Sequence, residues 1–220
     1  MRKSLDLLFW IIFILPAVFL AAMWGRLPEQ VPMHYNFKGE VDRYGSKTEL
    51  LILVGVITLV NVGVYLLMLN AHKIDPKRNA LANKPRMQRL GKVIAIFLTG
   101  LICYIIYSSA SSDGLIQSRF LYAGIGVLFC VLGNYLFNIK PNYFAGFRLP
   151  WALENEENWR LTHNLAGKIW FVGGLVIAAL ALLLPLSWFM PAFFTCLGIM
   201  VIVPTVYSYS IFRKHRSSKN

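Results

Sequence analysis

The sequence GNYLFNIKPNYFAGFRLPWALENEENWRLTHNLAG, from Gly133 to Gly167, separates two long apolar runs with a polar and aromatic segment. A plain connection between membrane helices is short and has no particular composition. This segment instead contains several aromatic residues, two prolines, glycines and paired polar groups. We therefore expect it to have a defined shape and to be a candidate contact surface.

The composition around this segment indicates a membrane protein. The chain is 57% hydrophobic and only 15% charged, which excludes an ordinary soluble domain. Apolar runs of about twenty residues can cross a hydrocarbon core of roughly 30 Å, and without alternating polarity they do so as helices. The sequence thus predicts an all-α membrane protein, a polytopic bundle of six transmembrane helices. The six runs are Leu5–Met23, Leu50–Leu69, Val93–Ser109, Phe120–Phe137, Ile169–Leu184 and Pro191–Phe212.

The basic residues predict how these helices are oriented. If both termini are cytoplasmic, 17 of the 22 lysines and arginines fall on the cytoplasmic side. This asymmetry is the positive-inside pattern, so the net charge of +12 indicates topology and anionic lipid headgroups rather than nucleic acid. The five basic residues on the outer side are Arg26, Lys38, Arg43, Lys47 and Arg119.

The first run has two interpretations. Its short basic start is compatible with a cleaved signal peptide, but its apolar part is long for one, and Ala21-Ala22-Met23 is a poor cleavage site. We favour an uncleaved first helix. The chain then divides into two parts. Residues 1–70 form a helix pair with a structured outer loop (24–49). Residues 71–220 form a four-helix region that contains the polar segment described above, called here the signature loop (133–168).

The outer loop has the pattern of a hairpin that forms a small extracytoplasmic cap. Prolines favour extended backbone before them, and Met33–Phe37 alternates in polarity as a short strand does. Lys38-Gly39 and Gly45 suit turns.

The inner connections are expected to begin and end at prolines. Asp75-Pro76 and Lys84-Pro85 are predicted to break helix continuity in the basic loop 71–92, which we interpret as a topology determinant. Pro185 and Pro191 are predicted to bracket a tight hairpin between the last two helices.

A short cytoplasmic interfacial helix is expected to lead from the signature loop into the fifth run. Asn155 is a good N-cap, and Glu156 and Glu157 suit the positive end of a helix. Trp159 and His163 stand four residues apart and would share one face.

The signature loop resembles that of the SdpI family of bacterial membrane proteins. The resemblance rests on Gly133-Asn134-Tyr135, Lys140-Pro141-Asn142, Gly146-Phe147-Arg148, Pro150-Trp151, Trp159-Arg160, Thr162-His163 and Gly167-Lys168. The outer loop is similar to a domain of unknown function that often precedes this signature. That second resemblance rests on Leu27-Pro28, Val31-Pro32, His34, Gly39, Asp42-Arg43 and Gly45-Ser46-Lys47.

The resemblance implies an immunity or signalling protein of the bacterial cytoplasmic membrane. Founding members of the family protect a cell against a secreted antimicrobial peptide and are described as holding a transcriptional repressor at the membrane. By this resemblance, the outer motif is a candidate for binding a toxin peptide, and the inner loops are candidates for contacting a repressor. No enzyme activity, catalytic residue or cofactor is expected.

A metal site on the outer loop is the first chemical alternative. His34 with Glu29, Glu40 and Asp42 offers nitrogen and oxygen ligands, but the spacing matches no known ligand pattern. A structural role is favoured, in which Asp42 and Arg43 pair with each other or bond to loop amides.

Catalysis by His163 is the second alternative. Histidine titrates near neutrality, and Glu156, Glu157 and Arg160 lie close in sequence. No serine or cysteine nucleophile lies beside it in a recognisable arrangement. We favour a structural role, in which His163, Asn164 and Asn142 bond to backbone groups and fix the loop.

A small transporter or channel is the third alternative. It requires a wet path lined by polar residues such as Asn61 and Asn134, which lie in the second and fourth runs. Asn61 is favoured as a hydrogen bond between helices. Small residues at Gly124, Gly126, Gly133, Gly174 and Ala178 would let helices approach closely, and Cys103, Cys130 and Cys196 are interpreted as packing residues.

Overall fold

A computed structural model describes residues 9–36, 40–77, 79–111, 114–137 and 139–217. The predicted turn residue Gly39 and the start of the first apolar run lie outside these ranges.

The chain divides into two compact units, Met1–Leu67 with Gly91–Leu121, and Met68–Leu90 with Tyr122–Asn220. In chain order the elements are η1 (Trp10–Phe13), α2 (Leu15–Met23), η2 (Trp24–Arg26), β1 (Gln30–Tyr35), β2 (Val41–Ser46), α3 (Lys47–Ile74), α4 (Ala80–Ala110), α5 (Gly114–Leu136), α6 (Pro150–Leu153), α7 (Glu156–Leu183) and α8 (Leu186–Ser217).

Five of the described helices are long and apolar enough to cross a membrane, which confirms the predicted mostly helical, multi-pass class. The described part of the first run is a shorter apolar helix, Trp10–Arg26, so a sixth span remains an expectation. The five helical segments are Lys47–Ile74, Ala80–Ala110, Arg119–Leu136, Glu156–Leu183 and Leu186–Ser217.

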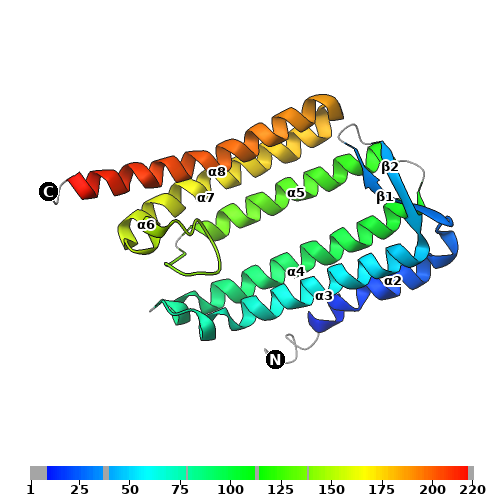
Figure 1. The fold of residues 1–220 in the computed structure, drawn as a ribbon, viewed down its shortest axis with the longest axis horizontal. Helices are drawn as coiled ribbons and strands as arrows, with labels where there is room; N and C mark the ends of the chain where they lie inside the picture. Colours follow the sequence, from blue (N-terminus) through cyan, green and yellow to red (C-terminus); the bar gives the residue numbers. More distant parts are fainter. Residues whose placement is uncertain (1–8, 37–39, 78, 112–113, 138, 218–220) are drawn as a thin grey trace. The chain divides into compact units, whose positions relative to one another are not determined.

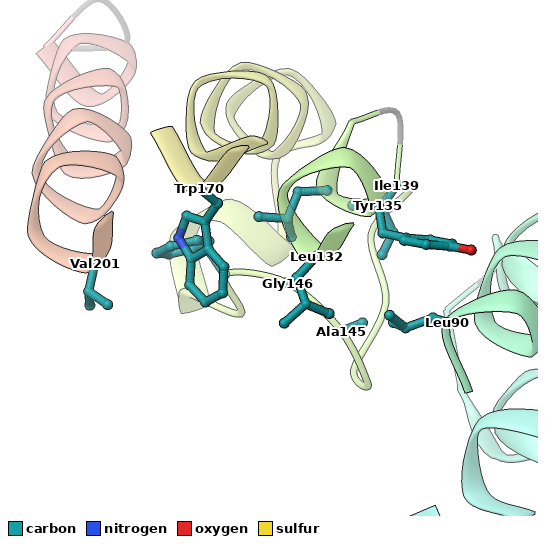
Figure 2. Close-up of a pocket in the computed structure, with 10 residues that line it drawn as sticks. Leu90, Leu132, Tyr135, Ile139, Ala145, Gly146, Trp170 and Val201 are labelled. Carbon is teal, nitrogen blue, oxygen red and sulfur yellow. The ribbon is translucent and has the colours of Figure 1, made fainter. Parts of the chain in front are cut away.

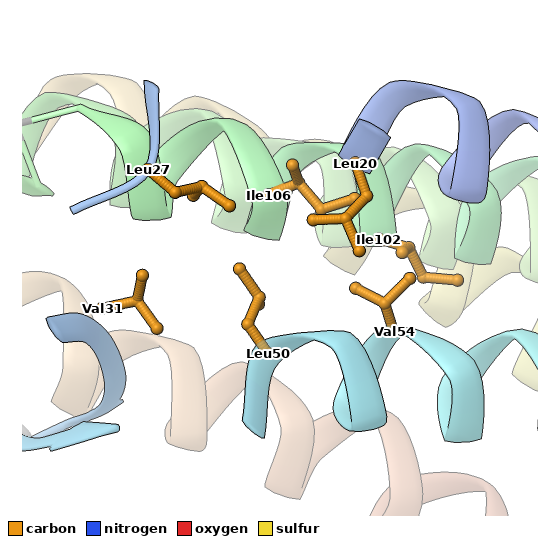
Figure 3. Packing of buried hydrophobic residues seen from close by; sticks show 7 residues of the cluster. All are labelled: Leu20, Leu27, Val31, Leu50, Val54, Ile102 and Ile106. Carbon is orange, nitrogen blue, oxygen red and sulfur yellow. The ribbon is translucent and has the colours of Figure 1, made fainter. Parts of the chain in front are cut away.

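The first unit is held together by an apolar cluster at the hairpin end of α3 and α4 (Figure 3). Leu50 and Val54 of α3 pack in this cluster with Ile102 and Ile106 of α4. Three further side chains join them from the segment before β2: Leu20, Leu27 and Val31. Because Val31 is fully buried, this cluster attaches the hairpin to the helices.

The predicted hairpin is present as an antiparallel pair of β1 and β2 (Figure 1). Gln30 pairs with Ser46 and Tyr35 with Val41, with irregular register between Pro32 and Tyr35. Gly45 permits close packing, because a Cβ there would lie 2.7 Å from Met33 Cγ.

A capping box joins β2 directly to α3. The amide of Glu49 donates to Ser46 Oγ (3.2 Å), and the amide of Ser46 donates to Glu49 Oε1 (3.3 Å). The hairpin is therefore tied to the first turn of α3 by both packing and hydrogen bonds.

In the second unit, α7 and α8 form an antiparallel pair along most of their length (Figure 1). Ile177 and Ala181 of α7 are buried against Phe189 and Met200 of α8. The helix α7 runs without a break from Glu156 to Leu183. The predicted interfacial helix is therefore the first part of α7 rather than a separate element.

Two of the predicted helix breaks are wrong. Pro85 lies inside α4, where the neighbouring buried residues Asn83 and Met87 hold the helix in place. Pro191 lies inside α8, which begins at Leu186. A proline removes one hydrogen bond, and packing contacts in a long apolar helix can compensate for that loss.

Glycines bring α5 and α7 into backbone contact, as the small-residue pattern predicts. A Cβ at Gly126 would lie 2.7 Å from the carbonyl oxygen of Gly174, and one at Gly133 would lie 2.8 Å from that of Gly167. The contacts are reciprocal, so each helix has two glycines at matching spacing. Gly124 does not take part, because a Cβ there would meet no described atom within 4 Å.

Replacing glycine inside and outside this contact tests it directly. Gly174→Ala is expected to destabilise the protein by about 1–3 kcal/mol, because its Cβ would lie 2.5 Å from the amide nitrogen of Cys130. Gly198→Ala in α8 meets no described atom within 4 Å and should stabilise by up to about 1 kcal/mol through helix propensity. Thermal unfolding of both variants in detergent measures this difference in stability. Equal unfolding midpoints for the two variants would contradict the close packing of α5 against α7.

Candidate functional site

The signature segment (residues 133–168) contains irregular backbone whose shape is fixed by buried side chains. Asn142 is almost fully buried and uses its whole hydrogen-bonding capacity on the backbone. Its Oδ1 accepts from the amides of Phe144 and Ala145, both at 2.8 Å. Its Nδ2 donates to the carbonyls of Lys140 (2.9 Å) and Ala145 (3.1 Å). The side chain thus closes a tight turn.

His163 fixes the next part of the segment from α7. Its Nε2 accepts from the amide of Phe147 (2.9 Å), and its Nδ1 lies 2.8 Å from the carbonyl of Trp159. The carbonyl only accepts, so the geometry assigns the proton to Nδ1 and the neutral form to the ring. Both nitrogens are engaged, which leaves neither for proton transfer or a metal ion. These contacts support the structural interpretation of His163.

Gly146 is the residue that lets the backbone approach His163. Its φ of 104° lies in the left-handed region, and a Cβ there would collide with the imidazole Nε2. The ring of Trp159 stacks on that of His163 with centroids 4.0 Å apart, as their predicted shared face requires. Trp159 Nε1 also donates to the carbonyl of Ile139 at 2.7 Å. Trp159 and His163 thus fix both ends of the irregular stretch.

The connection between α3 and α4, together with the first turn of α4, contributes a second set of bonds to the segment. Asn83 pairs with the backbone of Lys140, accepting from its amide (3.1 Å) and donating to its carbonyl (2.9 Å). Asp75 Oδ2 accepts from the amide of Tyr143 at 3.3 Å. Lys77 Nζ lies 5.6 Å from the Tyr143 ring centroid. Lys77 also donates to the carbonyl of Leu153 at 2.9 Å. The bonds of Asn83 and Asp75 to the segment were not predicted, and they give the basic loop a structural role beyond topology.

A buried polar network joins α6, α7 and α8. Asn158 Oδ1 accepts from Thr162 Oγ1 (2.9 Å) and Ser208 Oγ (2.7 Å), while its Nδ2 donates to the carbonyl of Ser208 (3.0 Å). Trp151 Nε1 donates to Ser208 Oγ at 3.1 Å. Two predicted members, Trp151 and Thr162, therefore have structural partners. Asn158 and Ser208 were not among the candidate residues.

The remaining predicted residues of the segment divide by exposure. Pro141 and Gly167 are buried, the latter in the contact with α5. Arg148 is exposed and donates from Nη1 to the carbonyl of Tyr143 (2.9 Å). The other exposed members are Asn134, Pro150 and Arg160. The signature thus contains an inner group that fixes its shape and an outer group that is open to contact.

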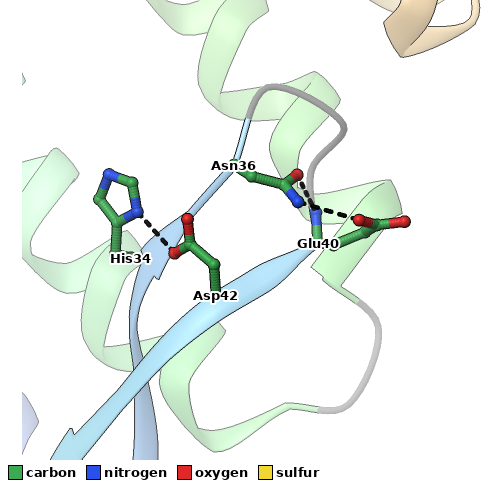
Figure 4. Close-up of polar contacts among 4 residues, drawn as sticks. All are labelled: His34, Asn36, Glu40 and Asp42. Atoms are coloured by element: carbon green, nitrogen blue, oxygen red, sulfur yellow. Dashed lines mark hydrogen bonds and ion pairs between the residues drawn. The ribbon is translucent and has the colours of Figure 1, made fainter.

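The outer motif forms a surface of paired polar side chains on the hairpin (Figure 4). His34 Nδ1 lies 2.6 Å from Asp42 Oδ1, and Asn36 Nδ2 donates to Glu40 Oε2 at 2.9 Å. Arg43 pairs with Glu49 (3.3 Å) rather than with Asp42.

The remaining acid of the predicted metal set, Glu29, pairs with Lys47 (3.0 Å). Among the described residues no group of three or more His, Cys, Asp or Glu side chains could hold a metal ion. Pro28 is exposed, whereas Pro32 lies in β1 opposite Tyr44.

Asn61 occupies a contact between α3 and α4. Its Nδ2 donates to the carbonyl of Ala95 (3.2 Å) and to Thr99 Oγ1 (3.1 Å), which is the interhelical role that the sequence analysis favours. Its Oδ1 is buried without a hydrogen-bond partner among the described residues. The amide group thus joins two helices.

Comparison with known proteins agrees with both motifs. Residues 138–208 match the SdpI/YfhL protein family, and residues 11–58 match a domain of unknown function, DUF1648. The chain therefore contains a region similar to the SdpI/YfhL family. It is 23% identical over 202 residues to Immunity protein SdpI of Bacillus subtilis strain 168, covering 90% of each chain.

A second relative shares a shorter region. An uncharacterized protein of Archaeoglobus fulgidus is 50% identical over 36 residues, which are 16% of this chain and 20% of that protein. No solved structure matches the chain. The similarity to SdpI and the five apolar helices together support a multi-pass membrane protein.

A double-mutant cycle tests the contact that fixes the signature segment. Gly146→Ala should destabilise through strain and collision with the imidazole, and His163→Ala should cost about 1–3 kcal/mol by leaving the Phe147 amide unpaired. The double variant should cost less than the sum, because the collision is gone.

Thermal unfolding in detergent measures each corner of this cycle. Gly25→Ala is the matched control, since a Cβ there meets no described atom within 4 Å. Strict additivity of the Gly146 and His163 substitutions would show that the two residues do not act on each other.

Proposed function

We propose that this protein is a membrane immunity protein that protects its cell against an antimicrobial peptide acting from outside. The observation that carries the proposal is the similarity to Immunity protein SdpI along 90% of both chains. The SdpI/YfhL match over residues 138–208 covers most of the signature segment and the two helices that follow it. The proposed role is binding and signalling, with no catalytic step and no cofactor.

The proposed location is the bacterial cytoplasmic membrane, crossed six times with both termini in the cytoplasm. The first crossing would use the whole run Leu5–Met23. The asymmetric distribution of lysine and arginine supports this orientation, which puts the hairpin outside and the signature segment inside. The division 1–70 and 71–220 is part of the proposal, because the two family matches fall in separate parts.

The hairpin is the proposed surface for the toxin peptide. It is rigidly attached through Val31 and the capping box, so it presents a fixed face. Tyr35 and Tyr44 are exposed on it, and aromatic side chains of this kind are enriched where proteins bind partners. The exposed His34–Asp42 pair adds polar contacts beside them.

The signature segment is the proposed inner contact for a cytoplasmic regulator such as a transcriptional repressor. Its buried residues keep a fixed shape, and Arg148 and Arg160 stay exposed upon it. Arginines suit recognition of acidic groups on a partner because they form paired hydrogen bonds.

Survival of a toxin-sensitive strain is the test of the immunity role. Cells that produce the protein are challenged with a panel of purified secreted antimicrobial peptides, and we expect higher survival against at least one. Tyr35→Ala with Tyr44→Ala should remove the protection, while Val56→Ala on an exposed apolar face of α3 should keep it. If cells with the protein survive no peptide of the panel better than cells without it, the immunity role is wrong.

Labelling of single cysteines tests the proposed orientation. In a variant with Cys103, Cys130 and Cys196 replaced by alanine, His34→Cys and Arg148→Cys each add one exposed thiol. A membrane-impermeant maleimide should label the first in intact cells and the second only after permeabilisation. Labelling of both thiols from the same side would overturn the six-crossing topology.

A further inference from the structure

A cavity of about 300 Å³ lies within the second unit, beside the irregular backbone of the signature segment (Figure 2). Its walls come from Leu132 and Leu136 of α5, Phe147 of the segment and Trp170 of α7. Leu90 and Val201 lie at its other edges. Apart from the hydroxyl of Tyr135, the lining side chains are apolar. The cavity is half open, and its mostly apolar lining favours an apolar occupant.

The cavity lies where apolar sequence gives way to polar sequence. Leu136 stands at the end of the fourth apolar run, Trp170 at the beginning of the fifth, and Leu90 just before the third. Three of the four helices that line the cavity thus reach it at the same kind of boundary, whereas Val201 of α8 lies in the middle of the sixth apolar run. In a bilayer this boundary corresponds to the depth at which lipid acyl chains join their headgroups.

Positively charged residues adjoin the cavity lining in the sequence. Three of its lining residues, Leu90, Ile139 and Phe147, each have an exposed cation as a direct chain neighbour; these are Arg89, Lys140 and Arg148. Apolar lining residues with exposed cations as chain neighbours suit an amphiphile that has a hydrocarbon chain and an anionic head.

We propose that this cavity binds one acyl chain of an anionic phospholipid, whose phosphate is attracted by Arg89, Lys140 and Arg148. The volume is at the lower end of the range for ligand sites, roughly 300–1,000 Å³, so it suits one chain rather than a whole lipid. Phe147 is both a wall of the cavity and the residue whose amide His163 holds. A bound chain therefore packs directly against the fixed part of the signature segment. This inference does not rest on the proposed immunity function.

Native mass spectrometry of the full-length protein in detergent tests the site, with phosphatidylglycerol and phosphatidylcholine of identical chains as probes. The wild type should retain phosphatidylglycerol and lose phosphatidylcholine. Val201→Trp, which fills the cavity from α8, should lose phosphatidylglycerol as well. Val203→Trp is the matched control, because Val203 is exposed on the same helix outside the cavity.

Two further variants separate the chain from the headgroup. Ala145→Leu fills the cavity from the loop without removing the backbone groups that Asn142 holds, so it should reproduce the loss even if Val201→Trp folds poorly. Arg89→Gln with Lys140→Gln should abolish the preference for phosphatidylglycerol. Equal retention of both lipids by the wild type, or undiminished retention by both filling variants, would overturn the proposal.

Discussion

The backbone between Ile139 and Phe147 forms neither helix nor strand, so its hydrogen bonds come from buried side chains. Asn142 and His163 each bind backbone groups within it, and Asn83 and Trp159 bind its beginning. Near a lipid boundary, unpaired amides and carbonyls are costly, so an irregular stretch survives only where other protein groups satisfy it. The shape of the signature segment depends on this constraint.

The rest of the second unit supports these side chains. The glycine contact of Gly133 with Gly167 brings the last turn of α5 against α7, beside the irregular backbone that connects the two helices. The network around Asn158 ties the first turn of α7 to α8. The buried side of the segment is already used in these bonds. The parts that can contact a lipid or a protein partner are its exposed arginines and the apolar cavity beside Phe147.

Local patterns in the sequence predicted local structure well. Hydropathy located five helices, and Asn155 does cap α7 through the amide of Asn158. The failures involve contacts between distant parts of the chain. Asn83 is paired with Lys140, 57 residues away, so its own surroundings give no signal. Pro191 lies inside α8 although proline disfavours a helix interior. The Ser46–Glu49 capping box can be read from the spacing of serine and glutamate, but it was not predicted.

Hydrogen exchange of the segment from Lys140 to Phe147, followed by mass spectrometry in detergent or nanodiscs, tests the central claim most directly. The amides of Phe144, Ala145 and Phe147 are held by Asn142 and His163, so they should exchange as slowly as the hydrogen-bonded amides in the second and third turns of α7. Asn142→Ala should make the first two exchange fast. Exchange of all three in the wild type at the rate of an unstructured peptide would contradict the account.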